Sequence, residues 1–88
     1  MTLEEFSREF GIEHRTLHVW VTRRWIIAEG EYLREIDVAR ARLIRDMQID
    51  MGVNDEGVEI ALHLIDQIHD LRRIMAGLHN GPNQDADR

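Results

Sequence analysis

Residues 52–78, GVNDEGVEIALHLIDQIHDLRRIMAGL, constrain the fold most, because their apolar residues recur at alternating three- and four-residue steps. This spacing is the a/d pattern of a helix that packs along another helix. Val58, Leu62 and Ile65 widen the apolar surface near its beginning, which indicates that this end packs on the chain's own domain. The sequence predicts one long helix over residues 54–79 whose later part pairs with a second copy. The expected interface residues are Ala61, Leu64, Ile68, Leu71, Met75 and Leu78.

A row of mostly acidic side chains is predicted on the opposite side of the same helix, at the same helical spacing. We call it the acidic stripe, and it consists of Glu59, His63, Asp66, Asp70 and Arg73. Asp66 and Asp70 are like charges one turn apart, which destabilises an isolated helix by a few tenths, roughly, of a kcal/mol. A solvated face is the ordinary interpretation of such a stripe, and a surface for a basic protein partner is the alternative.

Length and composition limit the remaining choices. A chain of 88 residues makes one domain and buries a modest fraction of its surface, so that association with a second copy would add stability. The first residues, MTLEEFSREF, are acidic and amphipathic, unlike a signal peptide, and no apolar run is long enough to span a membrane. The absence of cysteine excludes a disulfide framework and fits the cytoplasm. We expect a cytoplasmic protein, which is nucleoid-associated only if its partner is.

The charge balance bears on the kind of partner. The formal net charge is −6, whereas nucleic-acid binding depends largely on cations placed against phosphates. We therefore expect a basic protein partner rather than a nucleic acid.

The N-terminal part reads as a helix-turn-helix over residues 2–24. Thr2 and Glu5 form a capping box that begins the first helix, and Gly11 supplies the left-handed residue that ends it. Leu3, Phe6 and Phe10 lie on one face of that helix. The second helix follows, with inward residues Ile12, Leu17 and Val21 and with Trp20 at the edge of the core.

Residues 25–33 form a short extended arm or a small hairpin, because aromatic and β-branched residues flank Gly30. A third helix is predicted over residues 34–51, with Asp37 as its one good cap and with Leu43, Ile44, Met47 and Met51 on its inner side. Gly52 ends it, and Asn54 or Asp55 caps the long helix. We expect residues 80–88 to form a disordered tail. The predicted fold class is all-α, with residues 1–79 as a single helical domain.

The sequence holds no recognisable catalytic constellation, so we expect neither an enzyme nor a cofactor. Two pairs of histidines invite a metal hypothesis, His14 with His18 and His63 with His69. A structural zinc site needs four converging ligands, usually with cysteine, and we expect solvent-facing or capping histidines and no metal.

A local basic cluster on and after the second helix keeps DNA binding open as an alternative, since a helix-turn-helix places its second helix in the major groove. Glu29 and Glu31 in the arm, where a DNA-binding wing would carry cations, count against it. The cluster consists of Arg15, His18, Arg23 and Arg24.

Two resemblances follow from these residues. The N-terminal T-L-E-E-F, G-I-E-H-R-T-L-H-V-W and W-I-I segments resemble the truncated helix-turn-helix of MerR-type regulators. The chain departs from that pattern where those regulators touch DNA. His18, Val19 and Trp20 replace an Arg-Tyr-Tyr type run, Arg24 stands where glycine is usual, and the basic wing is missing.

The second resemblance is narrower. G-V-N-D-E-G-V-E-I-A-L-H-L-I-D-Q-I-H-D-L-R-R is similar to the signature helix of the chaperone-modulator (CbpM-type) family, which has a MerR-like fold. The resemblance implies a protein that binds the J-domain of a DnaJ-like (CbpA-type) co-chaperone and inhibits its action on an Hsp70-type chaperone. The resemblance to MerR-type regulators implies in addition an antiparallel homodimer through the last helix.

The resulting hypothesis is a homodimeric chaperone modulator with a MerR-like helix-turn-helix. The alternatives are a small MerR-like DNA-binding transcription regulator and a dimeric adaptor with neither partner. J-domains present a basic helix, so acidic residues are the expected contacts. They are Asp55, Glu56, Glu59, Asp66 and Asp70.

Overall fold

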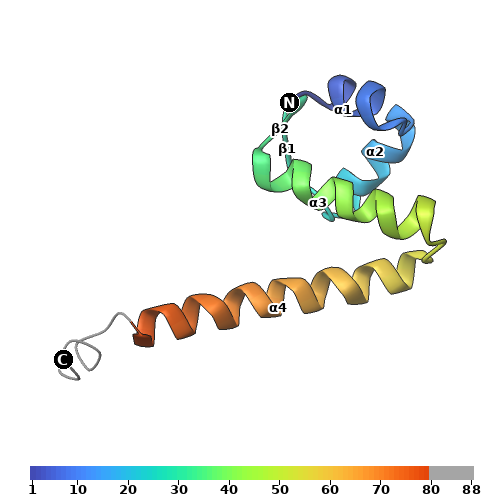
Figure 1. Cartoon of the computed structure of the whole chain (residues 1–88). Coiled ribbons are helices and arrows are strands. Elements are labelled where there is room, and N and C mark those ends of the chain that lie inside the picture. The colour runs from blue at the N-terminus through green and yellow to red at the C-terminus, as the bar shows by residue number, and fades with distance from the viewer. Residues whose placement is uncertain (80–88) are drawn as a thin grey trace. The chain divides into compact units, whose positions relative to one another are not determined.

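The computed structural model describes residues 1–79 and consists mainly of helices (Figure 1). Two compact units are distinguished, residues 1–58 and the residues from Glu59 onward. The expected tail, 80–88, lies outside the described residues. The elements are α1 (Leu3–Phe10), α2 (His14–Thr22), β1 (Ala28–Glu29), β2 (Tyr32–Leu33), α3 (Glu35–Arg45), the π-helical segment η1 (Asp46–Asp50) and α4 (Asp55–His79).

The ends of α1 are those that the sequence predicted. The Thr2 hydroxyl accepts from the backbone N–H of Glu5 at 3.0 Å, and the Glu5 carboxylate accepts from the backbone N–H of Thr2 at 2.7 Å. This capping box satisfies donors that the first turn leaves unpaired. Gly11 ends the helix with φ 67°. The capping box and the glycine cap are both confirmed.

The α2 helix packs on α1, and its buried residues differ from those predicted. Leu17 is fully buried, and Trp20, which was predicted at the edge of the core, is only 1% exposed. Val21, predicted to point inward, is half-buried. The prediction for Trp20 was wrong because, in a helix of nine residues, the elements that pack against it determine which side chains are buried. After the helix, Arg24 adopts φ 62°, a left-handed conformation that costs a non-glycine residue about 1–2 kcal/mol.

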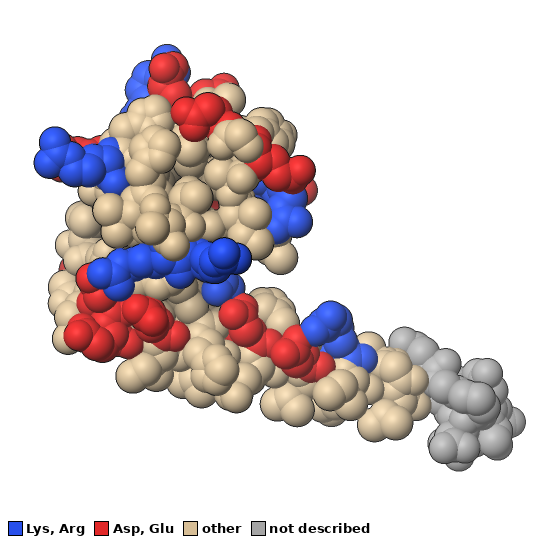
Figure 2. Space-filling view, turned by 180° about the vertical axis from the view of Figure 1, so that it is seen from behind, with Lys and Arg blue, Asp and Glu red and all other residues tan. Residues whose placement is uncertain are grey.

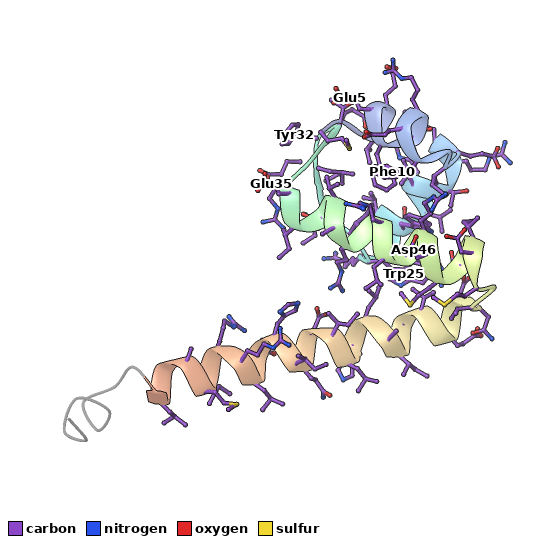
Figure 3. All side chains as sticks on the ribbon, viewed as in Figure 1. Glu5, Phe10, Trp25, Tyr32, Glu35 and Asp46 are labelled. Carbon is purple, nitrogen blue, oxygen red and sulfur yellow. The ribbon has the colours of Figure 1, made fainter. Side chains whose placement is uncertain are left out.

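Strands β1 and β2 form an antiparallel hairpin in which Ala28 faces Leu33 and Glu29 faces Tyr32. Its two-residue loop has a positive φ at Gly30 alone, 64°, as in a type II′ turn. Thr2 forms an isolated bridge to Tyr32, so the start of the chain lies beside the hairpin. Tyr32, labelled in Figure 3, is 54% exposed. The predicted arm is therefore a hairpin, supported by residues 1–3.

The third helix begins at Glu35, and its predicted cap residue, Asp37, forms other contacts. Asp37 does not cap the helix: it is 3% exposed and accepts from the backbone N–H of Ile27 at 3.0 Å and from Nε of Arg34 at 2.9 Å. The residue at the N-cap position is Arg34, which makes no side-chain capping bond. Asp37 thus joins the start of α3 to the segment before the hairpin.

The end of the third helix also differs from the prediction. Ile44 and Met47 are buried as expected, whereas Leu43 is half-buried and Met51 is 66% exposed. The chain widens into η1, where the N–H of Met51 donates to the carbonyl of Asp46 at 3.1 Å. A π turn holds more residues than an α turn, so the residues after it shift around the helix axis. This shift turns Met51 out of the inner side.

The first unit has a closed apolar core that draws on every element up to the start of α4 except β1. Nε of Arg45 donates to the carbonyl of Phe10 at 2.9 Å, and Arg40 donates to the carbonyl of Trp25, so that α3 holds the end of α1 and the segment before the hairpin. The buried apolar residues of this unit are Leu3, Phe6, Ile12, Leu17, Trp20, Trp25, Ile26, Leu33, Ala41, Ile44, Met47 and Val58.

Helix α4 begins as predicted, with Asn54 as its cap. The Asn54 side chain accepts from the backbone N–H of Gly57 at 2.8 Å. A Cβ on Gly57 would lie 2.6 Å from Cγ1 of Val53, so glycine is needed for this close approach. Val58 and Leu62 are buried and Ile65 is half-buried. From Glu59 to His79 most other side chains are exposed.

Candidate functional site

The residues of the basic cluster differ in their exposure and in their contacts. Arg15 and His18 are exposed on α2, and Arg24 is exposed just after it. Arg23 forms an ion pair with Asp55 at 3.1 Å and lies 5.4 Å from the centre of the Trp25 ring. An arginine held by a carboxylate and an aromatic face is less available for phosphate. Arg15 and Arg24 are thus the stronger candidates for a nucleic-acid contact.

Asp55 is engaged on both of its oxygens. Oδ2 pairs with Arg23, and Oδ1 accepts from the side-chain amide of Gln48 at 2.7 Å. A single ion pair therefore joins a residue of the alternative DNA-binding hypothesis to a residue expected to bind a basic protein. Glu56, the next residue, is exposed and is the better contact at this end of α4.

Acidic side chains surround the helix-turn-helix surface. Glu29 and Glu31 are exposed on the hairpin, in the position where a winged DNA-binding domain carries its wing. Exposed glutamates on α1 add to the negative charge, and Glu4 among them pairs with Arg8 at 3.7 Å. The hydrogen bond from the Thr2 backbone lowers the pKa of Glu5, which keeps this carboxyl ionised. These charges repel a phosphate backbone.

The acidic stripe on α4 is exposed at each of its positions. Asp70 pairs with Arg73 one turn away, and His63 and Gln67 approach each other at 3.4 Å. Figure 2 shows acidic side chains along the long helix, with basic side chains nearby, on the face that it draws. The structure brings Glu59, Asp66 and Asp70 onto one helix, as the spacing predicted.

The predicted interface residues of α4 are also exposed within the single chain. Leu64 is 51% exposed and Ile68 47%, and Leu71, Met75 and Leu78 are more exposed still, whereas Ala61 is half-buried. Ile60 and Ile74, which the a/d count omitted, are 62% and 58% exposed and widen this apolar surface. Counting the apolar residues both three and four positions away from each predicted interface residue would have found them.

The structure also brings together residues that the sequence kept apart. His14 and His18 lie with the hairpin residue Glu31, and one ligand atom of each lies within 4.8 Å of the others. The sequence signalled the histidine pair but not Glu31, which follows His18 after an intervening turn and strand. In residues 1–79 no helix has the length and hydropathy needed to cross a membrane.

The architecture of α1, α2 and a small hairpin followed by α3 and α4 defines a helix-turn-helix protein. A family model described as "MerR HTH family regulatory protein" matches residues 1–80. The chain belongs to this MerR-like family, as the N-terminal resemblance predicted. Comparison with curated proteins and with solved structures gave no match.

Proposed function

We propose that this chain is a chaperone modulator, which binds the J-domain of a DnaJ-like co-chaperone and inhibits its action on an Hsp70-type chaperone. The observation that carries the proposal is the exposed acidic stripe on α4. It lies in the segment that is similar to the signature helix of the chaperone-modulator family, and charge complementarity with a basic J-domain helix supplies the physical basis.

The charges on the helix-turn-helix unit support this proposal over DNA binding. The hairpin exposes Glu29 and Glu31, and Arg23 is paired with Asp55. Within the basic cluster, Arg15 and Arg24 then remain as the principal phosphate contacts. Each such contact contributes only about one unit to the salt dependence of DNA binding. A fold used elsewhere for reading DNA would here present a largely acidic surface to a protein.

The proposal includes a homodimer through α4. The exposed apolar residues from Ile60 to Leu78 lie on a helix of 25 residues, and water contact with such a surface is unfavourable. Pairing of two copies along the row of Leu64, Ile68, Leu71, Met75 and Leu78 would bury those residues and leave the acidic stripe on the opposite side of the helix.

Charge reversal separates the acidic stripe from the fold. In Asp66→Arg/Asp70→Arg we expect affinity for an isolated J-domain to fall at least tenfold and to lose most of its salt dependence, because like charges would then face each other. Helical content should survive, since exposed substitutions change stability by about 0.5 kcal/mol. Calorimetry of J-domain binding and the J-domain-stimulated ATPase rate of the Hsp70-type chaperone measure the effect.

The matched control is Glu9→Arg/Glu29→Arg, which changes the net charge equally and alters exposed acids outside α4. We expect it to bind the J-domain within about twofold of the original chain. Equal binding by the Asp66/Asp70 variant would show the stripe to be a solvated face and direct the search to Glu56. Absence of any heat with the original chain would refute the proposal itself.

DNA binding is the second candidate function, because Arg15 and Arg24 are exposed on and beside α2 in a chain that belongs to a family of regulators. A working reader would shift duplex DNA in a sequence-dependent way, lose affinity steeply with added salt and fail on Arg15→Ala. We expect no specific shift at physiological salt. A specific shift that persists there would replace the chaperone proposal with this one.

A further inference from the structure

We propose that His14, His18 and Glu31 form a binding site for a divalent transition-metal ion of the zinc class. One nitrogen from each imidazole and one carboxylate oxygen lie within 4.8 Å of one another. Among the described residues, 1–79, this is the one group of three or more such side chains that meets this distance. The site lies in the first unit, and none of its residues belongs to α4, so it is independent of the proposed J-domain contact.

The two histidines are positioned by α2. They stand four residues apart and therefore share one face of the helix. Their ring centres are 5.4 Å apart, with an angle of 26° between the ring planes. Leu17 and Trp20 anchor the helix in the core, and His18 itself is exposed. The buried anchors fix the helix and leave the imidazole open to an ion from solvent.

Glu31 is positioned by a backbone that is held on two sides. It follows Gly30 in the hairpin loop, and its carbonyl accepts from the N–H of Leu3 at 2.8 Å. The N–H of Leu33 donates to the carbonyl of Met1 at 2.7 Å, so that residues 1–3 lie along the hairpin. The backbone places the carboxylate of Glu31 beside α2, while the exposed side chain keeps its rotational freedom.

The donor set fits the proposed ion. Zn²⁺ binds imidazole nitrogen and carboxylate oxygen at about 2.0–2.2 Å, which places neighbouring donors of a tetrahedron about 3.3 Å apart. Rotation of exposed side chains can close the remaining distance from 4.8 Å. Two imidazoles favour Zn²⁺, Ni²⁺ or Cu²⁺ over Mg²⁺, which prefers oxygen ligands. Water would complete the coordination sphere.

The sequence argument against a metal site relied on the need for four protein ligands. That requirement holds for closed structural sites, whereas a site with three protein ligands and an open position needs neither a fourth side chain nor cysteine. The third ligand was hidden because it comes from a different element. A bound cation would also neutralise part of the acidic hairpin and join it to α2.

The test is calorimetric titration of the full chain with Zn²⁺ alone, at neutral pH and in a buffer that does not bind the ion. We expect saturable binding of one ion per chain and a higher Tm in its presence, because an ion that binds the folded state alone stabilises it. Mg²⁺ should give no saturable heat. Absence of saturable Zn²⁺ binding would overturn the proposal.

Variants assign the ligands. His18→Ala and Glu31→Gln should each weaken Zn²⁺ binding at least tenfold, and the matched control His63→Ala, an exposed histidine on α4, should leave it unchanged. Wild-type affinity in either ligand variant would overturn the three-ligand site. NMR of the original chain gives a measurement that needs no variant. Zn²⁺ should shift the ring resonances of His14 and His18 and not that of His63, and the reverse pattern would refute the site.

Discussion

Residues 1–58 and the part of α4 from Glu59 onward differ in the burial of their apolar side chains. In the first unit, Leu17 and Ile44 are fully buried, and the exposed apolar residues are scattered over different elements. On α4, Leu64, Ile68 and Leu71 form one exposed row. A helix satisfies its backbone hydrogen bonds internally, so it can form without a closed core, but an apolar row in water gains stability only from a partner. The first unit depends on its own contacts, and under the proposed dimer the second would gain stability from association.

The largest expected effect comes from making the same change in both regions. In Ile44→Asp, an unpaired charge enters the core at a cost of about 5 kcal/mol, which is comparable with the whole stability of a small domain. We expect this variant to unfold. Both tryptophans of the chain, Trp20 and Trp25, lie in the first unit, so intrinsic fluorescence reports on that core alone.

In Ile68→Asp, the charge replaces a side chain that is 47% exposed, so the tryptophan fluorescence should remain native. The dimer should weaken by about 3 kcal/mol or more, a factor above a hundred in Kd, because the charge would enter the interface. Analytical ultracentrifugation measures this, with the exposed neighbour His69→Asp as the control. An original chain that is monomeric at about 50 μM would contradict the dimer, because its free energy of association would then be weaker than roughly −6 kcal/mol.

A smaller effect is expected from the polar contact that joins the start of α3 to the preceding segment. Asp37→Ala leaves the N–H of Ile27 and the guanidinium of Arg34 without their acceptor, and we expect a loss of about 1–3 kcal/mol. Glu35→Ala, at an exposed position in the same helical turn, should change stability by about 0.5 kcal/mol or less. Urea unfolding followed by fluorescence compares them. Equal losses would show that Asp37 contributes through helix polarity alone.

The smallest effect concerns pH and is confined to the first unit. The hydrogen bond from the Thr2 backbone, with that from its hydroxyl, lowers the pKa of Glu5 from its ordinary value of 4.5. Its contribution to stability is therefore present above that value and is lost as pH falls through the lower folded-state pKa. An NMR titration of the Glu5 carboxyl should give the lowered pKa. Thr2→Pro removes both donors and should restore it; a lowered pKa in that variant would point to another cause.

Local chemistry made both ends of α1 and the start of α4 predictable. Thr2 with Glu5, Gly11 and Asn54 act within a few residues of themselves, so their roles can be read directly from the sequence. The acidic stripe and the apolar row of α4 were predictable for the same reason, since a long helix fixes which side chains share a face.

Contacts between distant segments escaped the sequence. Trp20 became a core residue, and Asp37 bonded to the segment before the hairpin. The π turn that moved Met51 out of the inner side is local, but its sequence carries no signal for it. The pairing of Arg23 with Asp55 joins α2 to the beginning of α4. The sequence placed the two residues in different candidate sites, and only the folded chain shows that they meet.

Arg24 carries a consequence for genetic selection. Its backbone is left-handed, the conformation that glycine adopts without strain, and every arginine codon is a single base from a glycine codon. The strain can therefore be relieved in one mutational step. Variant pools selected for fold stability alone should accumulate glycine at position 24, whereas pools selected for a function of the guanidinium should retain arginine. The residue that survives at this position reports which of the two pressures acts on the helix-turn-helix.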